Sequence, residues 1–163
     1  MGYLSNLLNR LMFRVLTILF CCMCLFSCSY NTYFYIFNTT DLPIHVIYES
    51  KGLTYGNAFR IDPIILSFNS RYAIENKSVQ SIIVIDSLTN SVQCELKNGE
   101  ALRIGGDFNF TLSNIGEAEI LKNNLIQLTI SQEEKELIRA DSSNIISFFE
   151  TIDIHTVGIV VEN

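Results

Sequence analysis

The sequence predicts a mainly β protein with antiparallel sheets, arranged as a sandwich or barrel. From Tyr30 onward, short runs of β-branched and aromatic residues are separated by turn residues, a pattern typical of all-β folds and not of nucleotide-binding α/β folds. Hydrophobic residues make up 48% and charged residues 17% of the chain, which is typical of folded proteins. A chain of 163 residues is long enough to bury one independent core.

The first 27 residues have the pattern of a targeting segment. They contain Arg10 and Arg14, no acidic residue, and an unbroken apolar or small run from Val15 to Phe26. A helix needs about 20 apolar residues to cross a bilayer, and this run has twelve. We therefore expect a signal peptide over residues 1–27 and a single β-rich domain over residues 28–163.

The apolar run ends in Leu25, Phe26, Ser27 and Cys28. These residues resemble the lipobox of bacterial lipoproteins, in which an aliphatic residue and a small residue precede the cysteine, although Phe26 is larger than the residue usual at its position. The resemblance implies cleavage between Ser27 and Cys28, with acyl chains such as palmitate attached at Cys28. Several acyl chains anchor a protein stably, so it also implies a bacterial cell-envelope location, on the outer membrane or the periplasmic face. The alternative is an ordinary signal peptide cut nearby, which leaves Cys28 as a free thiol.

Five strands are expected in the first part of the domain. Their ranges are 30–37, 44–48, 58–61, 72–75 and 81–86. The first two are separated by Asn38-Thr39-Thr40-Asp41 and Pro43, a turn that predicts a hairpin. The apolar run Ile82-Ile83-Val84-Ile85 predicts a central strand.

Five further strands and a helical region are expected in the second part. The strand ranges are 92–97, 101–104, 108–112, 125–130 and 156–161. Turns are expected at Asn98-Gly99 and at Gly105-Gly106-Asp107. Ser131-Gln132-Glu133-Glu134 matches a capping box, which predicts a helix carrying Leu137 and Ile138, and a further helical turn or two is expected at 145–149.

The order of several short motifs gives a second resemblance. These motifs are Tyr33-Phe34-Tyr35-Ile36, Asn38-Thr39-Thr40, Ile61-Asp62-Pro63, the 82–86 run, and Leu128-Thr129-Ile130-Ser131. In this order they resemble small uncharacterised lipoproteins with an immunoglobulin-like sandwich. The resemblance implies an antiparallel immunoglobulin-like β-sandwich with one or two short helices near the C-terminus, and it implies no activity.

Charge limits the classes of partner. The chain has 17 acidic and 11 basic residues, a net charge of −6, and removing residues 1–27 with their two arginines changes this to −8. Because the basic residues are scattered singly, we expect no nucleic-acid partner. The expected partners are a membrane, through the lipid on Cys28, and an envelope protein. Tyr30, Tyr33 and Tyr35 follow Cys28 closely and are candidates for a membrane or partner surface as well as for core packing.

The candidate chemical groups are sparse. His45 and His155 are the two histidines, and they are far apart in sequence. Cys94 alternates with Val92 and Leu96, so we expect a buried, inert thiol. Cys21, Cys22 and Cys24 lie in the apolar run and lack the second ligand pair of a zinc site. We therefore expect no catalytic residue, no metal and no cofactor.

Two other motifs are weak candidates for ligand binding. Gly105-Gly106-Asp107 lacks the lysine and flanking glycines of a phosphate-binding loop. Asp107, Glu117 and Glu119 lack the alternating oxygen ligands of a calcium loop, so a solvated acidic surface is expected. Glu133, Glu134 and Glu136 fit the first turn of the expected helix, where negative charge is favourable.

Three functional hypotheses follow. The first is a membrane-tethered, non-enzymatic binding or assembly module of the bacterial envelope. The second is a small-ligand-binding protein or enzyme whose site forms only in the fold, with His45 or His155 near carboxylates. The third is a structural subunit of a fibre or secretion machine, for which a long exposed edge strand is the expected sign.

Overall fold

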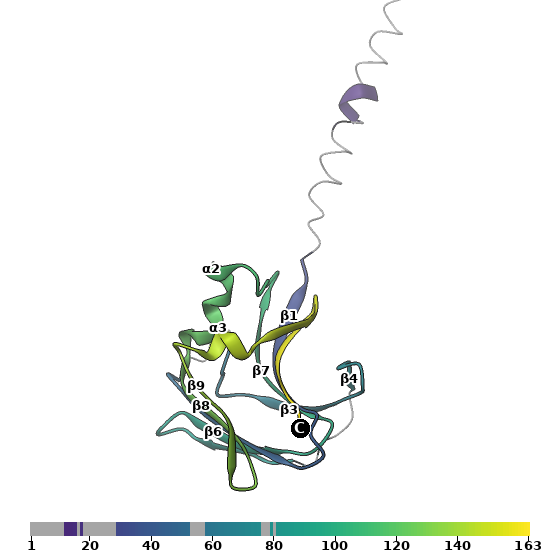
Figure 1. Ribbon diagram of the computed structural model, residues 1–163. Helices are drawn as coiled ribbons and strands as arrows, with labels where there is room; N and C mark the ends of the chain where they lie inside the picture. The colour runs from purple at the N-terminus through teal and green to yellow at the C-terminus, as the bar shows by residue number, and fades with distance from the viewer. Residues whose placement is uncertain (1–11, 16, 18–28, 53–57, 76–78, 80) are drawn as a thin grey trace, which may run out of the picture.

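A computed structural model describes residues 12–15, 17, 29–52, 58–75, 79 and 81–163 of the chain (Figure 1). Cys28 and the cleavage site before it lie outside the described residues, as do Cys21, Cys22 and Cys24. Among the described residues, no helix has the length and apolar character needed to cross a bilayer.

The strands form two sheets. The six-stranded sheet has the order β10 (Glu150–Asp153), β11 (Thr156–Val161), β1 (Asn31–Asn38), β7 (Glu100–Phe108), β3 (Ile64–Phe68) and β4 (Ile74–Glu75). The five-stranded sheet has the order β5 (Ile83–Asp86), β6 (Ser91–Leu96), β2 (Ile44–Ser50), β8 (Leu125–Gln132) and β9 (Lys135–Asp141). All pairs are antiparallel except β1 with β11, which is parallel. The prediction of a mainly β protein with mostly antiparallel sheets and few short helices is confirmed.

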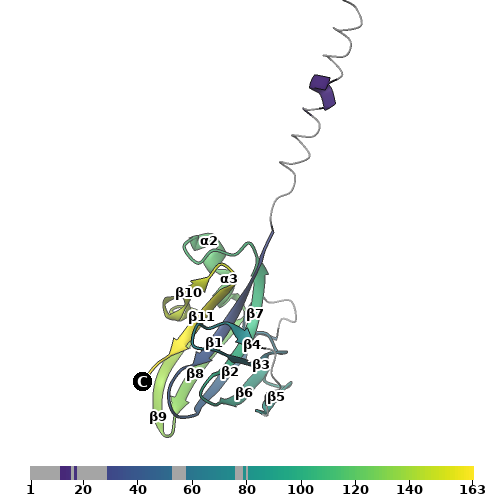
Figure 2. The ribbon, with the colours of Figure 1, turned by 90° about the vertical axis from the view of Figure 1, so that its right-hand side faces the viewer.

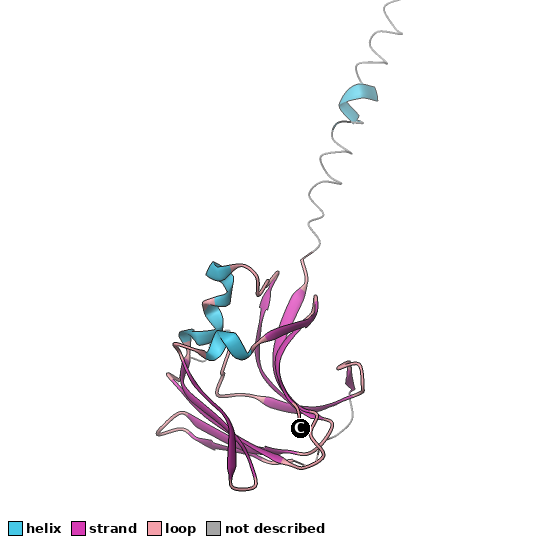
Figure 3. Ribbon diagram, in the orientation of Figure 1, coloured by secondary structure: helices cyan, strands magenta, loops and turns pink. Residues whose placement is uncertain are grey.

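The main core includes the inward faces of both sheets and a helical layer. Phe34 and Ile36 on β1 and Val46 and Tyr48 on β2 are fully or almost fully buried. Three short helices, α2 (Ile115–Ala118), α3 (Ile120–Asn123) and the 3₁₀ helix η1 (Ile145–Phe148), lie at the same end of the molecule (Figure 3). Of these, η1 matches the helical turn expected at 145–149, whereas α2 and α3 were not predicted.

A second, smaller cluster covers part of the outer face of the six-stranded sheet. Tyr35, Phe37 and Ala101 are buried there, and Phe68 and Tyr72 from the β3–β4 region pack against them. The Phe37 ring lies over the neighbouring strand, where a Cβ on Gly158 would be 2.6 Å from a ring carbon. Position 158 therefore needs glycine because the ring occupies the space of a side chain.

The predicted hairpin of the first two strands is wrong, because β1 and β2 belong to different sheets. The connection is held by buried Asn38, whose side-chain amide donates to the carbonyls of Leu42 (2.9 Å) and Leu96 (2.8 Å). Its side-chain oxygen accepts from the Thr40 hydroxyl at 2.7 Å. Leu96 lies on β6 of the other sheet, so these hydrogen bonds fix the connection between the two sheets.

Residues 83–85 of the 82–85 run belong to β5, which is an edge strand and not the predicted central one. β5 pairs with β6 and is the last strand of its sheet. Val84 and Ile85 are 59% and 48% exposed. Branched side chains favour an extended backbone at the edge and at the centre alike, so composition did not determine the strand's position.

The helix predicted from the capping box at Ser131–Glu134 is also wrong. The segment closes a β8–β9 hairpin, in which Ile130 pairs with Ile138 and Gln132 with Lys135. Glu133 adopts φ 53°, in the left-handed region that tight turns use. In β8, the alternation of buried and more exposed residues continues through Ser131. The hydrogen bonds along the whole β8–β9 pair stabilise the strand more than two capping hydrogen bonds would stabilise a helix.

The turn predicted at Gly105–Asp107 lies inside β7, and the strand predicted at 108–112 is not formed. A Cβ on Gly106 would lie 2.8 Å from the Thr32 carbonyl oxygen, so glycine here permits close approach of β1 and does not make a turn. Phe110 is buried in the following loop, with its ring 4.8 Å from that of Phe34. Residues 58–61 likewise form a loop and not the predicted strand.

Of the other predicted strands, 156–161 is found with the predicted bounds and the rest are found with shifted ends. The 92–97, 101–104, 125–130 and 156–161 ranges correspond to β6, β7, β8 and β11. The 72–75 range shortens to the two residues of β4. The turn at Asn98–Gly99 is present, but β6 and β7 on either side of it lie in different sheets.

Candidate functional site

A cavity of about 490 Å³ opens on the outer face of the six-stranded sheet. Its walls come from the start of β1, the end of β7, and the loop that leads into β3. The polar side chains that line it are Asn31, Thr32, Tyr33, Arg60, Asp62, Arg103 and Asp107. Strand alternation places Tyr33 on the same face as Tyr35 and Phe37, so the cavity lies beside the outer aromatic cluster.

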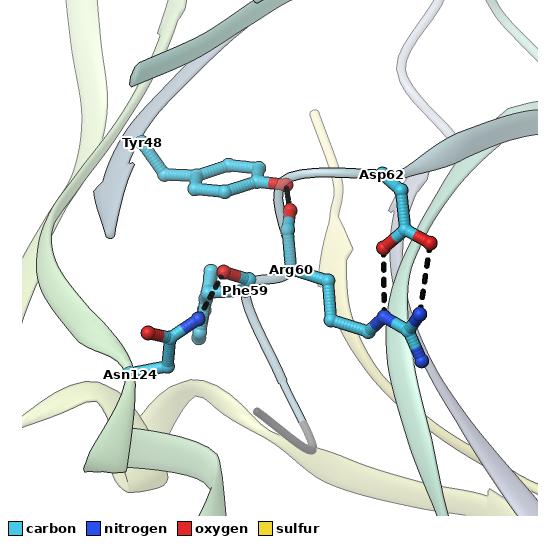
Figure 4. Close-up of polar contacts among 5 residues, drawn as sticks. All are labelled: Tyr48, Phe59, Arg60, Asp62 and Asn124. Carbon is cyan, nitrogen blue, oxygen red and sulfur yellow. Dashed lines mark hydrogen bonds and ion pairs between the residues drawn. The ribbon is translucent and has the colours of Figure 1, made fainter. Parts of the chain in front are cut away.

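Arg60 and Asp62 form a bidentate ion pair in this cavity (Figure 4). Arg60 Nε donates to Asp62 Oδ1 at 2.7 Å, and Nη2 donates to Oδ2 at 2.8 Å. The hydrogen bonds from Arg60 lower the pKa of the Asp62 carboxyl, and Asp62 in turn raises the pKa of Arg60. The pair is therefore charged at neutral pH. The two side chains are 39% and 58% exposed, so both reach solvent.

The backbone that carries this pair is held by groups from β2, from the end of α3 and from β7. The Tyr48 hydroxyl on β2 donates to the Arg60 carbonyl, and the Asn124 side-chain amide donates to the Phe59 carbonyl at 2.8 Å (Figure 4). The Arg60 amide donates to the Ile104 carbonyl of β7 at 3.0 Å. Burial raises the pKa of Tyr48, so its hydroxyl stays protonated and remains a donor. The loop is thus fixed where the ion pair emerges.

Arg103 contributes a second guanidinium to the cavity. Its Cζ atom lies 5.4 Å from the centre of the Tyr33 ring, within the range of a cation–π contact. Arg103 also helps to lower the pKa of Asp62, although less than Arg60 does. Burial raises the pKa of the neighbouring Tyr35 hydroxyl, and Arg103 opposes that rise. Arg103 therefore lies over the Tyr33 ring on the wall of the same cavity as Asp62.

These groups suit reversible recognition of a polar molecule. Two guanidinium groups offer fixed donors, Asp62 and Asp107 offer acceptors, and Tyr33 offers a ring that is 37% exposed. Among the described residues that line the cavity, none is a cysteine or a histidine. The groups present can bind and orient a polar ligand.

The two histidines identified from the sequence do not meet. His45 on β2 pairs across the strands with Glu95 on β6, its Nε2 atom 3.7 Å from Oε2, on the exposed face of the five-stranded sheet. His155 lies in the β10–β11 turn, where its Nδ1 atom is 3.1 Å from the Asn31 carbonyl and its ring is 5.9 Å from that of Tyr30. Neither histidine lines the cavity.

Cys94 lies in the main core, as the sequence predicted. It is 3% exposed, and burial raises the pKa of its thiol to about 12. A thiol in this state is almost entirely protonated at neutral pH and is a poor nucleophile.

The acidic residues considered as calcium ligands are used in different ways. Asp107 lines the cavity. Glu117 accepts hydrogen bonds from the Thr111 amide (2.7 Å) and the Asn114 side chain (2.8 Å), and Glu119 pairs with Lys122 at 2.6 Å. Within the described ranges, no three histidine, cysteine or acidic side chains gather as a metal site would require.

The sequence named Tyr33 and Asp107 as candidates but missed the two arginines and Asp62 as cavity residues. Arg60 was placed in a predicted strand, and Asp62 entered only as part of the Ile61-Asp62-Pro63 motif, although an arginine and an aspartate two positions apart can form an ion pair. Arg103 gave no comparable signal, since it is one basic residue within a predicted strand. Its position beside Tyr33 depends on the pairing of β1 with β7.

Comparison of the chain with protein-family models, curated proteins and solved structures finds no match. The geometry of the cavity and its position beside the first residues of β1 are therefore the observations that bear on function.

Proposed function

We propose that the chain is a lipid-anchored, non-enzymatic binding module of the bacterial envelope, built on an immunoglobulin-like sandwich, and that the cavity is its binding site. The observation that carries the proposal is the Arg60–Asp62 pair, which is exposed to the cavity but fixed through its backbone to Tyr48 and Asn124. A binding group that is already held in place loses little freedom when a ligand arrives, which favours recognition.

The position of the cavity supports its connection to the anchor. Asn31 lines the cavity and follows Cys28 by three residues. A lipid on Cys28 would therefore keep the binding site close to the membrane surface. A ligand or partner would meet the protein at that surface and not far from it.

The enzyme hypothesis has less support. It needs His45, His155 or Cys94 to meet carboxylates in a concave site, whereas the first two lie on the surface of different sheets and the third lies in the core. The fibre hypothesis relies on an exposed edge strand. β5 has only four residues, which is short for strand addition by a partner, whereas β9 at the opposite edge of the five-stranded sheet has seven residues and is the candidate strand for this hypothesis.

The anchor is tested by intact mass and membrane partition of the full chain, with Cys28→Ala as the variant. We expect wild type to begin at Cys28, to carry the mass of its acyl chains and to pellet with membranes, and we expect the variant to be soluble or unprocessed. Cys24→Ala is the matched control and should behave as wild type. An unlipidated, soluble wild-type protein would contradict the proposed anchor.

Binding is tested by thermal unfolding with three probes: a neutral monosaccharide, acetate and inorganic phosphate. A ligand at 100 times its Kd stabilises the folded state by about 2.7 kcal/mol, so binding appears as a higher Tm. We expect one probe class to raise the Tm of wild type, with the effect lost in Arg103→Ala and in Arg60→Gln. The control Arg71→Ala changes an exposed arginine outside the cavity and should keep the effect. A response that survives both cavity variants would place binding elsewhere.

A further inference from the structure

We propose that the end of the molecule where the chain enters β1 rests on the surface of a zwitterionic bilayer, with Phe108, Ile115 and Ile154 in contact with the lipid. This inference rests on the proposed anchor, and it adds a defined orientation to it. The three side chains are 71%, 82% and 66% exposed, respectively.

The three residues come from three segments, of which the first two follow each other in sequence and the third lies later in the chain. Phe108 is the last residue of β7, Ile115 is the first residue of α2, and Ile154 lies in the turn between β10 and β11. In both Figure 1 and Figure 2, the start of β1 lies at the end of the molecule where α2 lies. The β8–β9 turn lies at the opposite end in both views.

Hydrogen bonds hold these segments around the start of β1. The Tyr30 amide donates to Asn109 Oδ1 at 3.0 Å, and the Asn109 amide donates to the Tyr30 carbonyl at 2.9 Å, immediately after Phe108. The Thr32 hydroxyl donates to the Ile154 carbonyl at 3.0 Å. The Thr111 amide bonds to Glu117, which ties the loop after β7 to α2. The apolar residues are thus presented by a fixed rim and not by a loose terminus.

The reach of the chain limits how far this rim can lie from a membrane. Asn31 is three positions after Cys28, and a fully extended chain spans at most about 3.6 Å per residue, or roughly 11 Å in total. An acylated Cys28 therefore keeps the start of β1 within roughly 11 Å of the anchored cysteine. Single exposed apolar residues are common on protein surfaces, but these three surround the point to which the anchor is tied.

Charge at this end favours neutral headgroups. Asp107, Glu117 and Asp153 belong to the same three segments as the apolar residues, and the whole chain carries a net charge of −6. Their carboxylates repel anionic lipids, whereas apolar contact with a zwitterionic surface has no such cost. We therefore assign a zwitterionic bilayer as the occupant of this surface.

The chain contains no tryptophan, so one introduced tryptophan reports its own surroundings. The test uses the acylated protein, which begins at Cys28, in phosphatidylcholine vesicles with brominated acyl chains, which quench tryptophan on contact. Phe108→Trp and Ile154→Trp report on the rim. Glu134→Trp, in the β8–β9 turn, is the matched control at the opposite end. We expect blue-shifted emission and several-fold stronger quenching at positions 108 and 154 than at position 134.

The outcomes separate this inference from the anchor. Vesicle-bound, acylated protein with equal quenching at all three positions overturns the proposed orientation and leaves the anchor in place. Protein that lacks the acyl mass and does not bind vesicles overturns the anchor and the orientation together. Stronger quenching at 108 and 154 in phosphatidylglycerol than in phosphatidylcholine vesicles overturns the choice of a zwitterionic surface.

Discussion

The outer faces of the two sheets differ in how they meet solvent. On β2 of the five-stranded sheet, buried residues alternate with partly or fully exposed ones, so Ile47 is 39% exposed while Val46 and Tyr48 are buried. On β1 of the six-stranded sheet, every residue from Phe34 to Asn38 is buried. The five-stranded sheet is therefore covered on one face, whereas the six-stranded sheet is covered on both faces along part of its length.

The cavity lies where the outer cover of the six-stranded sheet ends. Along β1, exposure rises from 0% at Phe37 through 3% at Tyr35 to 37% at Tyr33. Tyr33 lines the cavity, with Arg103 over its ring. The outer aromatic cluster therefore covers the sheet at one end and borders the cavity at the other.

The largest expected effect is the loss of the buried ring on the outer face. Phe37→Ala should destabilise the protein by about 3–5 kcal/mol, because a fully buried phenylalanine leaves a cavity that its neighbours fill only in part. Ile47→Ala, on the outer face of the other sheet, should change stability by less than about 1 kcal/mol. Urea unfolding of both variants measures the difference, and equal effects would show that the outer cluster contributes little.

The next effect concerns the contact between β11 and the same ring. Gly158→Ala places a Cβ 2.6 Å from the Phe37 ring, and overpacking of this kind costs about 1–3 kcal/mol. Gly116→Ala is the control, since its Cβ would meet its nearest neighbour at 3.5 Å, an ordinary contact. The midpoint of urea unfolding should fall for the first variant and not for the second. An unchanged unfolding midpoint in Gly158→Ala would mean that the Phe37 ring is free to move aside.

A smaller effect is expected at the support of the cavity. Tyr48→Phe removes the hydroxyl that donates to the Arg60 carbonyl and leaves that acceptor without this donor, at a cost of about 1–3 kcal/mol. Because the loop carries the ion pair, the variant should also weaken binding of any probe that stabilises wild type. Unfolding and probe binding measured on one sample check both effects. Unchanged binding with reduced stability would show that the loop keeps its position without Tyr48.

The smallest expected effect is the pH dependence of the ion pair. The pKa of Asp62 is lowered in the folded protein, so the pair contributes stability at pH values above the ordinary aspartate pKa and loses it as pH falls through the lowered value. The effect on stability is small, because both side chains are largely exposed. Carboxyl titration by NMR should give an Asp62 pKa below the usual range, and Arg60→Gln should return it toward that range. An ordinary value in wild type would show that the pair is not held in solution.

Much of the secondary structure could be predicted, and its errors have a common cause. The alternation in β6 and β8 records which face of a strand is buried, and this signal is local. The capping-box pattern at Ser131–Glu134 is also local, but it competes with a strand pairing that becomes visible only when β9 lies beside β8. The prediction of a central position for β5 is wrong for the same reason, because the strands that pair in a sheet are set by contacts between residues far apart in sequence.

The sequence by itself determined the mainly β class, most strand positions and the burial of Cys94, because each depends on the spacing of apolar side chains along one strand. The lipid anchor at Cys28 stays a prediction from its pattern. Only the tertiary structure decided which sheet each strand joined, and hence that Tyr33, Arg60, Asp62 and Arg103 share one cavity. Cross-strand hydrogen bonds and the contacts of Tyr48 and Asn124 bring these residues together, and neither is encoded in the local spacing of any one segment.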